Sequence, residues 1–265
     1  MRFAFSTLGV PDMPVDQVAR LAADNGFHGV ELRASPEGPV HTGLSAGERA
    51  DVAAEFAKAG VEVLTVAGYA KVAAAGDDGP VLDEIAAGVT LAHDLGASFV
   101  RVFPGGEGLP AEEADALAAR RLAAAAPEAA DQGVRVLLET HDSHRAGADV
   151  ARVLGRVGHL GAGALWDVMH TWLAGEQPPA SFAALGPYLG YLQVKDIASA
   201  TDTTPLALGA GVLPLAETVE VLSRAEWDGW LCWEYEKRWY PQAPDLPGQL
   251  GAAREHLARL LTESA

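Results

Sequence analysis

The chain has 265 residues, which is enough for one large hydrophobic core, and a formal net charge of −17 at pH 7. This charge argues against nucleic acid as a partner, because binding to phosphate backbones requires a basic surface. The only cysteine, Cys232, lies in an apolar run, so an intramolecular disulfide is excluded.

Short β-branched or aromatic runs alternate with longer helical patterns rich in Ala and Leu, and the unit recurs about every 33 residues. The pattern predicts strands at residues 2–8, 29–33, 61–67, 98–103, 134–140, 164–168, 191–195 and 230–235. It predicts helices at residues 15–25, 46–59, 80–95, 112–132, 146–157, 182–189, 215–224 and 246–262. Eight such units indicate an α/β fold, a single (β/α)8 TIM barrel in which residues 1–265 form one domain.

The loops of the predicted barrel are unequal in length. Those that lead from a helix into the next strand are very short, with a glycine just past the helix at Gly26, Gly60, Gly96 and Gly133. Those that follow the strands are longer and rich in Gly, Pro and His, which places a functional face at the carboxyl ends of the strands. An open doubly wound sheet would often carry a Gly-rich phosphate turn after its first strand, and residues 6–9 (STLG) are not such a turn.

The N-terminal segment lacks a basic start followed by a long apolar region. No apolar run approaches the roughly 20 residues that a membrane span requires. We therefore expect a soluble, cytoplasmic protein without a membrane partner; a homo-oligomer is left open.

Four successive predicted strands, the fifth to the eighth, end in an oxygen-bearing side chain. These are Glu139, Asp167, Gln193 and Glu234. Adjacent barrel strands lie about 5 Å apart, so a cluster of carboxylates at one height repels itself unless a cation lies within it. The four residues are therefore predicted to bind one divalent metal ion. Each of them, taken alone, would more often be an ordinary surface group.

Further polar residues follow the same strand ends. His141 and His170 are predicted to contact the substrate, although a turn after Glu139 would direct His141 elsewhere. Glu236 and Arg238 are predicted to form a rim around an oxygen-rich or anionic ligand; a charged loop packed against the last helix is the alternative. Lys195 is expected to face away from Gln193 and to pair with Asp196. Aromatic side chains that could line a sugar pocket are Tyr69, Phe103, Trp166, Trp172, Trp233 and Trp239.

Five segments together resemble the xylose-isomerase-like TIM barrel superfamily, in its sugar phosphate isomerase/epimerase branch. They are GFHGVELR (26–33), LLETHD (137–142), WDVMH (166–170), QVKD (193–196) and WEYE (233–236). The resemblance implies that Glu139, Asp167, Gln193 and Glu234 are the metal ligands, that Glu139 and Glu234 are also the catalytic acid and base, and that His170 contacts the substrate. Two departures are Gln193, where the branch commonly has His, and Gly209-Ala210-Gly211, where it commonly has G-E-G.

This reading predicts a divalent-metal-dependent isomerase or epimerase of a small polyhydroxy carbonyl compound (a sugar, ketose or inosose), which acts through an enediolate. The alternative is a lyase, a dehydratase of the inosose or dehydroshikimate type that uses the same site. A barrel that binds a sugar or cyclitol without reaction is the alternative outside enzymes. Because the predicted ligands are all oxygen donors, Mn²⁺ is the expected metal, with Mg²⁺ or Co²⁺ as alternatives.

Overall fold

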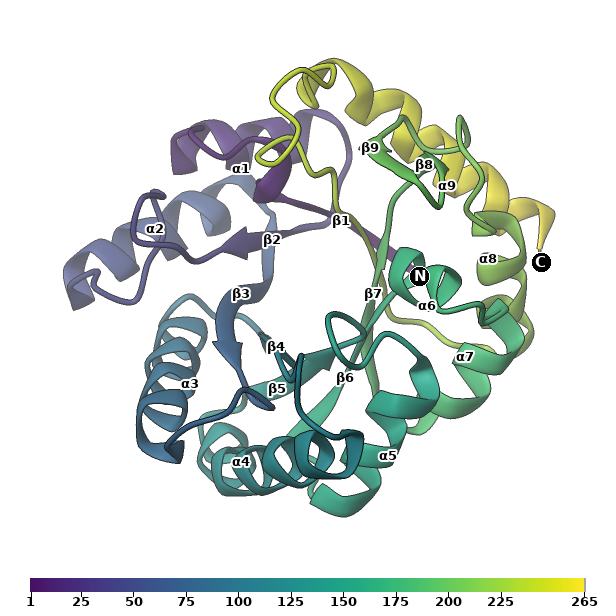
Figure 1. Ribbon diagram of the computed structural model, residues 1–265. Coiled ribbons are helices and arrows are strands. Elements are labelled where there is room, and N and C mark those ends of the chain that lie inside the picture. Colours follow the sequence, from purple (N-terminus) through teal and green to yellow (C-terminus); the bar gives the residue numbers. More distant parts are fainter. Residues whose placement is uncertain (265) are drawn as a thin grey trace.

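In a computed structural model, which describes residues 1–264, eight parallel strands close into a barrel in the order β1-β10-β7-β6-β5-β4-β3-β2 (Figure 1). The barrel strands are β1 (Arg2–Ser6), β2 (Gly29–Arg33), β3 (Glu62–Lys71), β4 (Phe99–Phe103), β5 (Arg135–Glu139), β6 (Ala162–Asp167), β7 (Leu189–Val194) and β10 (Trp230–Trp233). The predicted TIM barrel is thus confirmed.

Helices surround the barrel. They are α1 (Val15–Asp24), α2 (Ala46–Ala59), α3 (Asp78–Asp94), α4 (Ala111–Asp131), α5 (Gly147–Val157), α6 (Val168–Leu173), α7 (Pro178–Leu185), α8 (Leu215–Arg224) and α9 (Leu250–Glu263). No helix in the described part of the chain is both long and apolar enough to cross a membrane.

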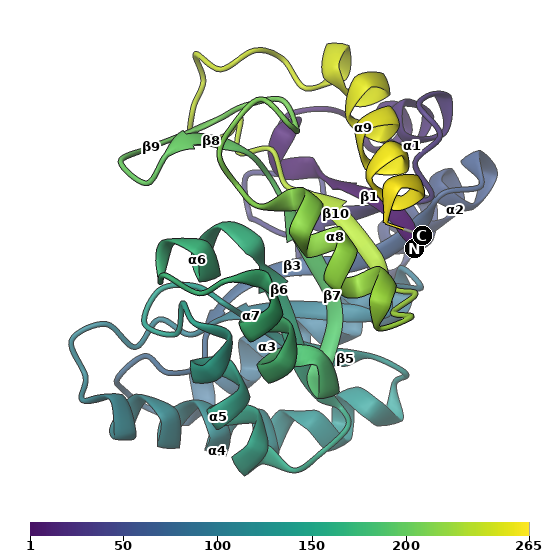
Figure 2. The ribbon, with the colours of Figure 1, turned by 90° about the vertical axis from the view of Figure 1, so that its right-hand side faces the viewer.

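The structure differs from the predicted elements mainly after β6 and β7. The short helix α6 was not predicted; it begins directly after β6 because the Asp167 side chain accepts hydrogen bonds from the backbone N–H groups of Met169 and His170. The helix predicted at 182–189 is instead α7, followed by a 3₁₀ turn, and Leu189 already belongs to β7. After β7, an antiparallel hairpin of β8 (Ile197–Ser199) and β9 (Asp202–Pro205) extends from the barrel (Figure 2).

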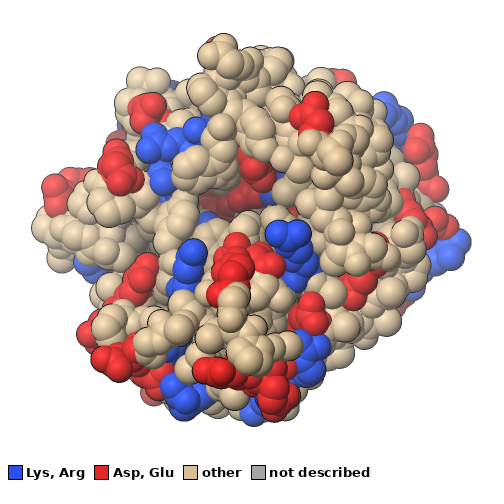
Figure 3. Space-filling view, viewed as in Figure 1, with Lys and Arg blue, Asp and Glu red and all other residues tan. Residues whose placement is uncertain are grey.

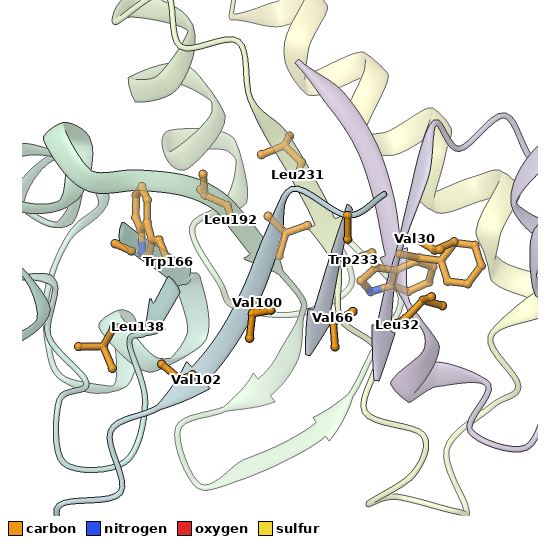
Figure 4. Packing of buried hydrophobic residues seen from close by; sticks show 14 of the residues in the cluster. Val30, Leu32, Val66, Val100, Val102, Leu138, Trp166, Leu192, Leu231 and Trp233 are labelled. Atoms are coloured by element: carbon orange, nitrogen blue, oxygen red, sulfur yellow. The ribbon is translucent and has the colours of Figure 1, made fainter. Parts of the chain in front are cut away.

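Alternation along each strand separates two environments. Outward-facing residues such as Leu138, Leu192 and Leu231 pack in the large core between the strands and the helices (Figure 4). Inward-facing residues nearer the start of each strand form a second apolar cluster inside the barrel, which we call the lower layer. It consists of Ala4, Leu64, Leu137, Leu165, Tyr191, Trp230 and Cys232. Its packing closes the barrel interior beneath the carboxyl-terminal mouth.

Candidate active site

A pocket of about 260 Å³ lies at the carboxyl-terminal mouth of the barrel. Figure 3 shows acidic side chains deep in a hollow near the centre of this face, with basic side chains around it. The pocket is lined by Leu8, Tyr69, Arg101, Phe103, Glu139, His141, Met169, His170, Leu173, Thr203, Glu234, Glu236 and Trp239. Polar groups from several different strands therefore face one small cavity, as in an enzyme active site built on a barrel.

The four predicted metal ligands come from neighbouring strands of this mouth. Glu139 ends β5, Asp167 ends β6, Gln193 lies in β7, and Glu234 directly follows β10. All four are buried. The Gln193 Nε2 group donates to Glu234 Oε1 over 3.1 Å. The structure therefore brings the four side chains to one region, and their roles as ligands stay a prediction.

Lys195 lies inside this cluster, and the expectation that it faces away from Gln193 is wrong. Residues two apart along a strand share a face, so Lys195 points inward like Gln193. Its Nζ lies 2.8 Å from Asp167 Oδ2 and 2.9 Å from Glu236 Oε1, and it also contacts Glu234 Oε2. Burial opposes protonation of Lys195, but the charges of these three carboxylates outweigh it and raise its pKa. The chain thus supplies an ammonium group among the predicted metal ligands.

Asp196 does not pair with Lys195. Its carboxylate instead accepts hydrogen bonds from the backbone N–H groups of Gly209, Gly211 and Leu213. A Cβ atom at Gly211 would lie 2.3 Å from Asp196 Oδ1, so only glycine allows this close approach. Asp196 therefore fixes the loop that follows the β8–β9 hairpin.

Sequence reasoning missed Glu31 and Arg101 as members of the site. Glu31, in β2, is fully buried and accepts hydrogen bonds from Tyr191 Oη (2.5 Å) and from Gln193 Nε2 (3.0 Å). Arg101, in β4, donates from Nη1 to Glu139 Oε2 over 2.7 Å. The available signal was a charged residue within the apolar strands GVELR and FVRVF, since strands covered on both faces are otherwise apolar.

We call the inward-facing polar residues above the lower layer the upper layer. It consists of Glu31, Arg101, Glu139, Asp167, Gln193, Lys195 and Glu234. Its acidic members are electrostatically crowded. Burial raises the pKa of Glu139 to about 7, although the Arg101 charge acts in the opposite direction. Burial, with the Glu234 charge, also raises the pKa of Glu31.

His141 and His170 both line the pocket, and their contact with a substrate stays a prediction. Their ring centroids lie 4.0 Å apart. Burial opposes protonation of His141, but its hydrogen bond with Asp142 and the Glu139 charge outweigh this effect and raise its pKa. Burial and the neighbouring His141 lower the pKa of His170, whose Nδ1 has no hydrogen-bond partner in residues 1–264. The pair therefore combines a histidine that favours its proton with one that favours the neutral form.

The two predicted rim residues have different positions. Glu236 lines the pocket and holds Lys195, whereas Arg238 lines a separate cavity together with Lys237 and residues 9–14. The structure thus places Glu236, but not Arg238, at the wall of the 260 Å³ pocket.

The aromatic residues also divide into two groups. Tyr69, Phe103 and Trp239 line the pocket. Trp166 and Trp233 belong to the core outside the strands (Figure 4), and Trp172 packs against that core. The expectation of a pocket position is therefore wrong for these three tryptophans.

The residues fit a divalent cation in their chemistry. Glu139, Asp167 and Glu234 offer carboxylate oxygens, and Gln193 Oε1 is buried without a hydrogen-bond partner in the described chain. Such hard oxygen donors suit Mn²⁺ or Mg²⁺. A second donor set overlaps the first: one ligand atom each from Glu139, His141 and His170 lie within 4.8 Å of one another. The two sets share Glu139, which lines the pocket, so a cation held by either set would lie beside that residue.

A sequence model of one protein family, described as xylose isomerase-like TIM barrel, matches residues 19–260. None of the curated proteins matches the chain by sequence.

Solved structures with the same fold cover nearly the whole chain. The D-psicose 3-epimerase of Clostridium cellulolyticum, solved with D-tagatose, is 15% identical with a TM-score of 0.84, and the match covers 98% of this chain and 99% of that one. The probable 3-DHS dehydratase AsbF of Bacillus anthracis is 18% identical with a TM-score of 0.80, over 97% and 99% of the two chains. The IolI protein, solved with a zinc atom, is 14% identical with a TM-score of 0.84, over 100% and 99%. At these identities the likeness establishes the fold.

Proposed function

The chain belongs to the xylose isomerase-like TIM barrel family, and we propose that it is an isomerase or epimerase of a small polyhydroxy carbonyl compound. The observation that carries this proposal is the pair Glu139 and Glu234. Glu139 ends β5 and Glu234 directly follows β10; these strands are separated by β6 and β7 in the barrel, and both residues line the 260 Å³ pocket. A substrate between them would have one carboxyl group on each side.

The proposed metal ligands are Glu139, Asp167, Gln193 and Glu234, with Mn²⁺ as the preferred ion because the donors are all oxygens. A divalent cation there would supply Lewis-acid chemistry, which withdraws electron density from a carbonyl group and acidifies the adjacent C–H bond. The unpartnered Gln193 Oε1 supports this role, because a buried amide oxygen is otherwise costly to leave without a partner.

The proton transfers fall to the two carboxyl groups. In the metal-free protein the pKa of Glu139 is raised to about 7, so this carboxyl group is suited to accept and release a proton near neutral pH. One of the two groups would remove a proton from the carbon next to the carbonyl group, and the other would return a proton to the opposite face of that carbon. This inverts the centre, whereas return of the proton to the neighbouring carbon would interconvert an aldose and a ketose. His170 would position a substrate hydroxyl group.

A second candidate is a dehydratase. His141 lines the pocket, and its raised pKa favours the protonated form, which could protonate a departing hydroxyl group. After removal of the proton by Glu139 or Glu234, the C–O bond would break, water would leave, and a carbon–carbon double bond would remain.

The test is incubation of the protein in ²H₂O with Mn²⁺ and a panel of ketoses, aldoses and inososes, including members that carry a carboxylate or a phosphate ester, followed by NMR and mass spectrometry. An isomerase or epimerase is expected to introduce deuterium at carbon in an isomer of unchanged composition, and a dehydratase to give a product lighter by one water. Glu234→Gln is the control that should do neither. Absence of both reactions across the panel, with ligand binding retained, would instead support a barrel that only binds its ligand.

A further inference from the structure

Arg33, at the end of β2, has no carboxylate partner within 4.0 Å in residues 1–264, although the protein is strongly acidic. Its guanidinium group is held by neutral side chains instead. Nε donates to Tyr69 Oη, and Nη1 donates to Ser35 Oγ over 2.6 Å. Its central carbon lies 5.2 Å from the Tyr69 ring centroid and 5.7 Å from that of Trp239. The group is therefore fixed in orientation, and among residues 1–264 it has no ion-pair partner and its Nη2 has no hydrogen-bond acceptor.

Arg33 lines a cavity of about 680 Å³ that adjoins the 260 Å³ pocket. Tyr69 and Arg101 line both cavities, and Trp239, which approaches Arg33, lines the smaller one. A ligand whose reacting carbons lie beside Glu139 could thus extend past Tyr69 to Arg33. The smaller pocket alone is close to the size of a simple sugar, so the larger cavity provides room for an additional group.

The charges of the two cavities differ. The smaller pocket is lined by Glu139, Glu234 and Glu236, and it would repel a negatively charged group. Arg101, which lines both cavities, is already paired with Glu139. The larger cavity is lined by two carboxylates, Glu37 and Glu84. A backbone hydrogen bond, a hydrogen bond with Ser35 and the charge of Arg33 lower the pKa of the exposed Glu37, but within residues 1–264 neither carboxylate forms an ion pair with Arg33. Arg33 is thus the group with which an anion would pair.

We propose that the substrate carries an anionic group, a carboxylate or a phosphate ester, and that Arg33 binds this group in the 680 Å³ cavity. The proposal deepens the proposed function and rests on it, because it places the reacting part of the same substrate between Glu139 and Glu234. The planar guanidinium group matches both anions, since it donates two parallel hydrogen bonds to a pair of oxygens.

The test compares three non-reacting polyols by calorimetry at low ionic strength: sorbitol, gluconate and sorbitol 6-phosphate. Hydrogen bonds between Arg33 and an anion would contribute to the free energy of binding. At least one of the two anions is therefore expected to bind about 10- to 100-fold more tightly than sorbitol. A preference for gluconate would identify a carboxylate, and a preference for sorbitol 6-phosphate would identify a phosphate ester.

Arg33→Met is expected to abolish the preference and to leave sorbitol binding unchanged, whereas Arg33→Lys, which keeps the charge but not the paired donors, should retain part of it. Arg254→Met is the matched control, because it also replaces an arginine by methionine. Arg254 belongs to α9 and lies beside Gly26, which precedes β2, whereas Arg33 ends β2; this variant should keep the preference. Equal binding of all three polyols, no binding of either anion, or a preference that survives in Arg33→Met would overturn the proposal. Because no turnover is measured, this result is independent of the deuterium experiment that tests the proposed function.

Discussion

The lower and upper layers both face the barrel interior, and on β5, β6 and β7 the same strand contributes to both. Leu137 precedes Glu139 by two residues in β5, and Leu165 precedes Asp167 by two in β6. Both layers are buried, yet the first is apolar and the second is charged. Burial of a charged group costs free energy unless the charge is compensated. The upper layer therefore destabilises the folded state, and the requirements of packing do not explain its presence. The comparison separates the residues that hold the barrel together from those that we propose to perform chemistry.

Charge compensation in the upper layer is incomplete. Together with Glu236, it contains the carboxyl groups of Glu31, Glu139, Asp167 and Glu234, against the two cations Arg101 and Lys195. Five potential negative charges against two positive ones leave three in excess. Burial, the largest cause, and mutual repulsion raise the pKa values of Glu31, Glu139 and Glu236. A divalent cation or an exchangeable proton would relieve this excess.

We expect the largest effect when either proposed acid/base residue of the upper layer, Glu139 or Glu234, loses its carboxyl group. Glu139→Gln and Glu234→Gln should each reduce turnover about 10²- to 10⁴-fold, because each removes a proton carrier while keeping the side-chain shape. The measurement is the rate of deuterium incorporation into the substrate. Thermal unfolding of both variants should show no loss of stability, and full activity in either variant would contradict the two-carboxylate mechanism.

The opposite result is expected from the lower layer. Leu137 is fully buried, and its side chain fills the space left by Gly163 and Gly190. Leu137→Ala should reduce the free energy of unfolding by about 2–5 kcal/mol through lost burial and a residual cavity. The measurement is urea denaturation, with Leu160→Ala, at an exposed position, as the control. If Leu137→Ala is fully folded under the assay conditions and still loses activity, the separation of the two layers is contradicted.

The sequence predicted the barrel and the strand ends more reliably than the partners within the site. Apolar runs that end in Glu139 or Asp167 locate a strand and its carboxyl end together, and the fold and family predictions are confirmed. Glu31 and Arg101 were missed because each looks like one irregular residue in an apolar strand. Only the closed barrel brings Glu31 of β2 against Gln193 of β7 across its interior, and Arg101 of β4 against Glu139 of the adjacent β5. The position of Lys195 was predicted wrongly, although the two-residue period of a strand is enough to place it on the face of Gln193.

Stability should depend on pH in opposite directions at the upper layer and at the surface. The pKa of Glu139 is raised from 4.5 to about 7, so the metal-free folded protein binds more protons than the unfolded chain between these values, and stability should fall as pH rises through this window. Hydrogen bonds from Arg120 and Arg121 lower the pKa of Asp78 from 3.8 to about 2, so stability should also fall as pH decreases through that lower window.

For the upper window, the loss between pH 5 and 7 is on the order of 2 kcal/mol, since one pKa unit corresponds to about 1.4 kcal/mol. Urea denaturation with a chelator present would measure it. Glu139→Gln should have a shallower decline than the unsubstituted protein, with the remainder due to Glu31 and Glu236. Identical slopes in the two proteins would show that Glu139 does not titrate differently on folding.

The smallest expected effect concerns the competition between Lys195 and a metal ion for the same oxygens. The ammonium group is held by Asp167 and Glu234, two of the four proposed ligands, so a cation bound there must share or displace it. Lys195→Met keeps the length of the side chain and removes a positive charge that repels the metal ion. We expect Mn²⁺ to bind about tenfold more tightly, a change of about 1.4 kcal/mol.

Calorimetric titration of the chelator-treated protein with Mn²⁺ would measure this change. Lys237→Met is the matched control, because Lys237 pairs with Asp245 and loop carbonyl groups outside the cluster, and its removal should leave the affinity unchanged. Weaker binding in Lys195→Met would mean that the ammonium group positions Asp167 and Glu234 for the metal ion rather than competing with it. No Mn²⁺ uptake by any of the three proteins would instead count against the metal in the proposed function, since Lys195 would then be the cation that the upper layer is built to hold.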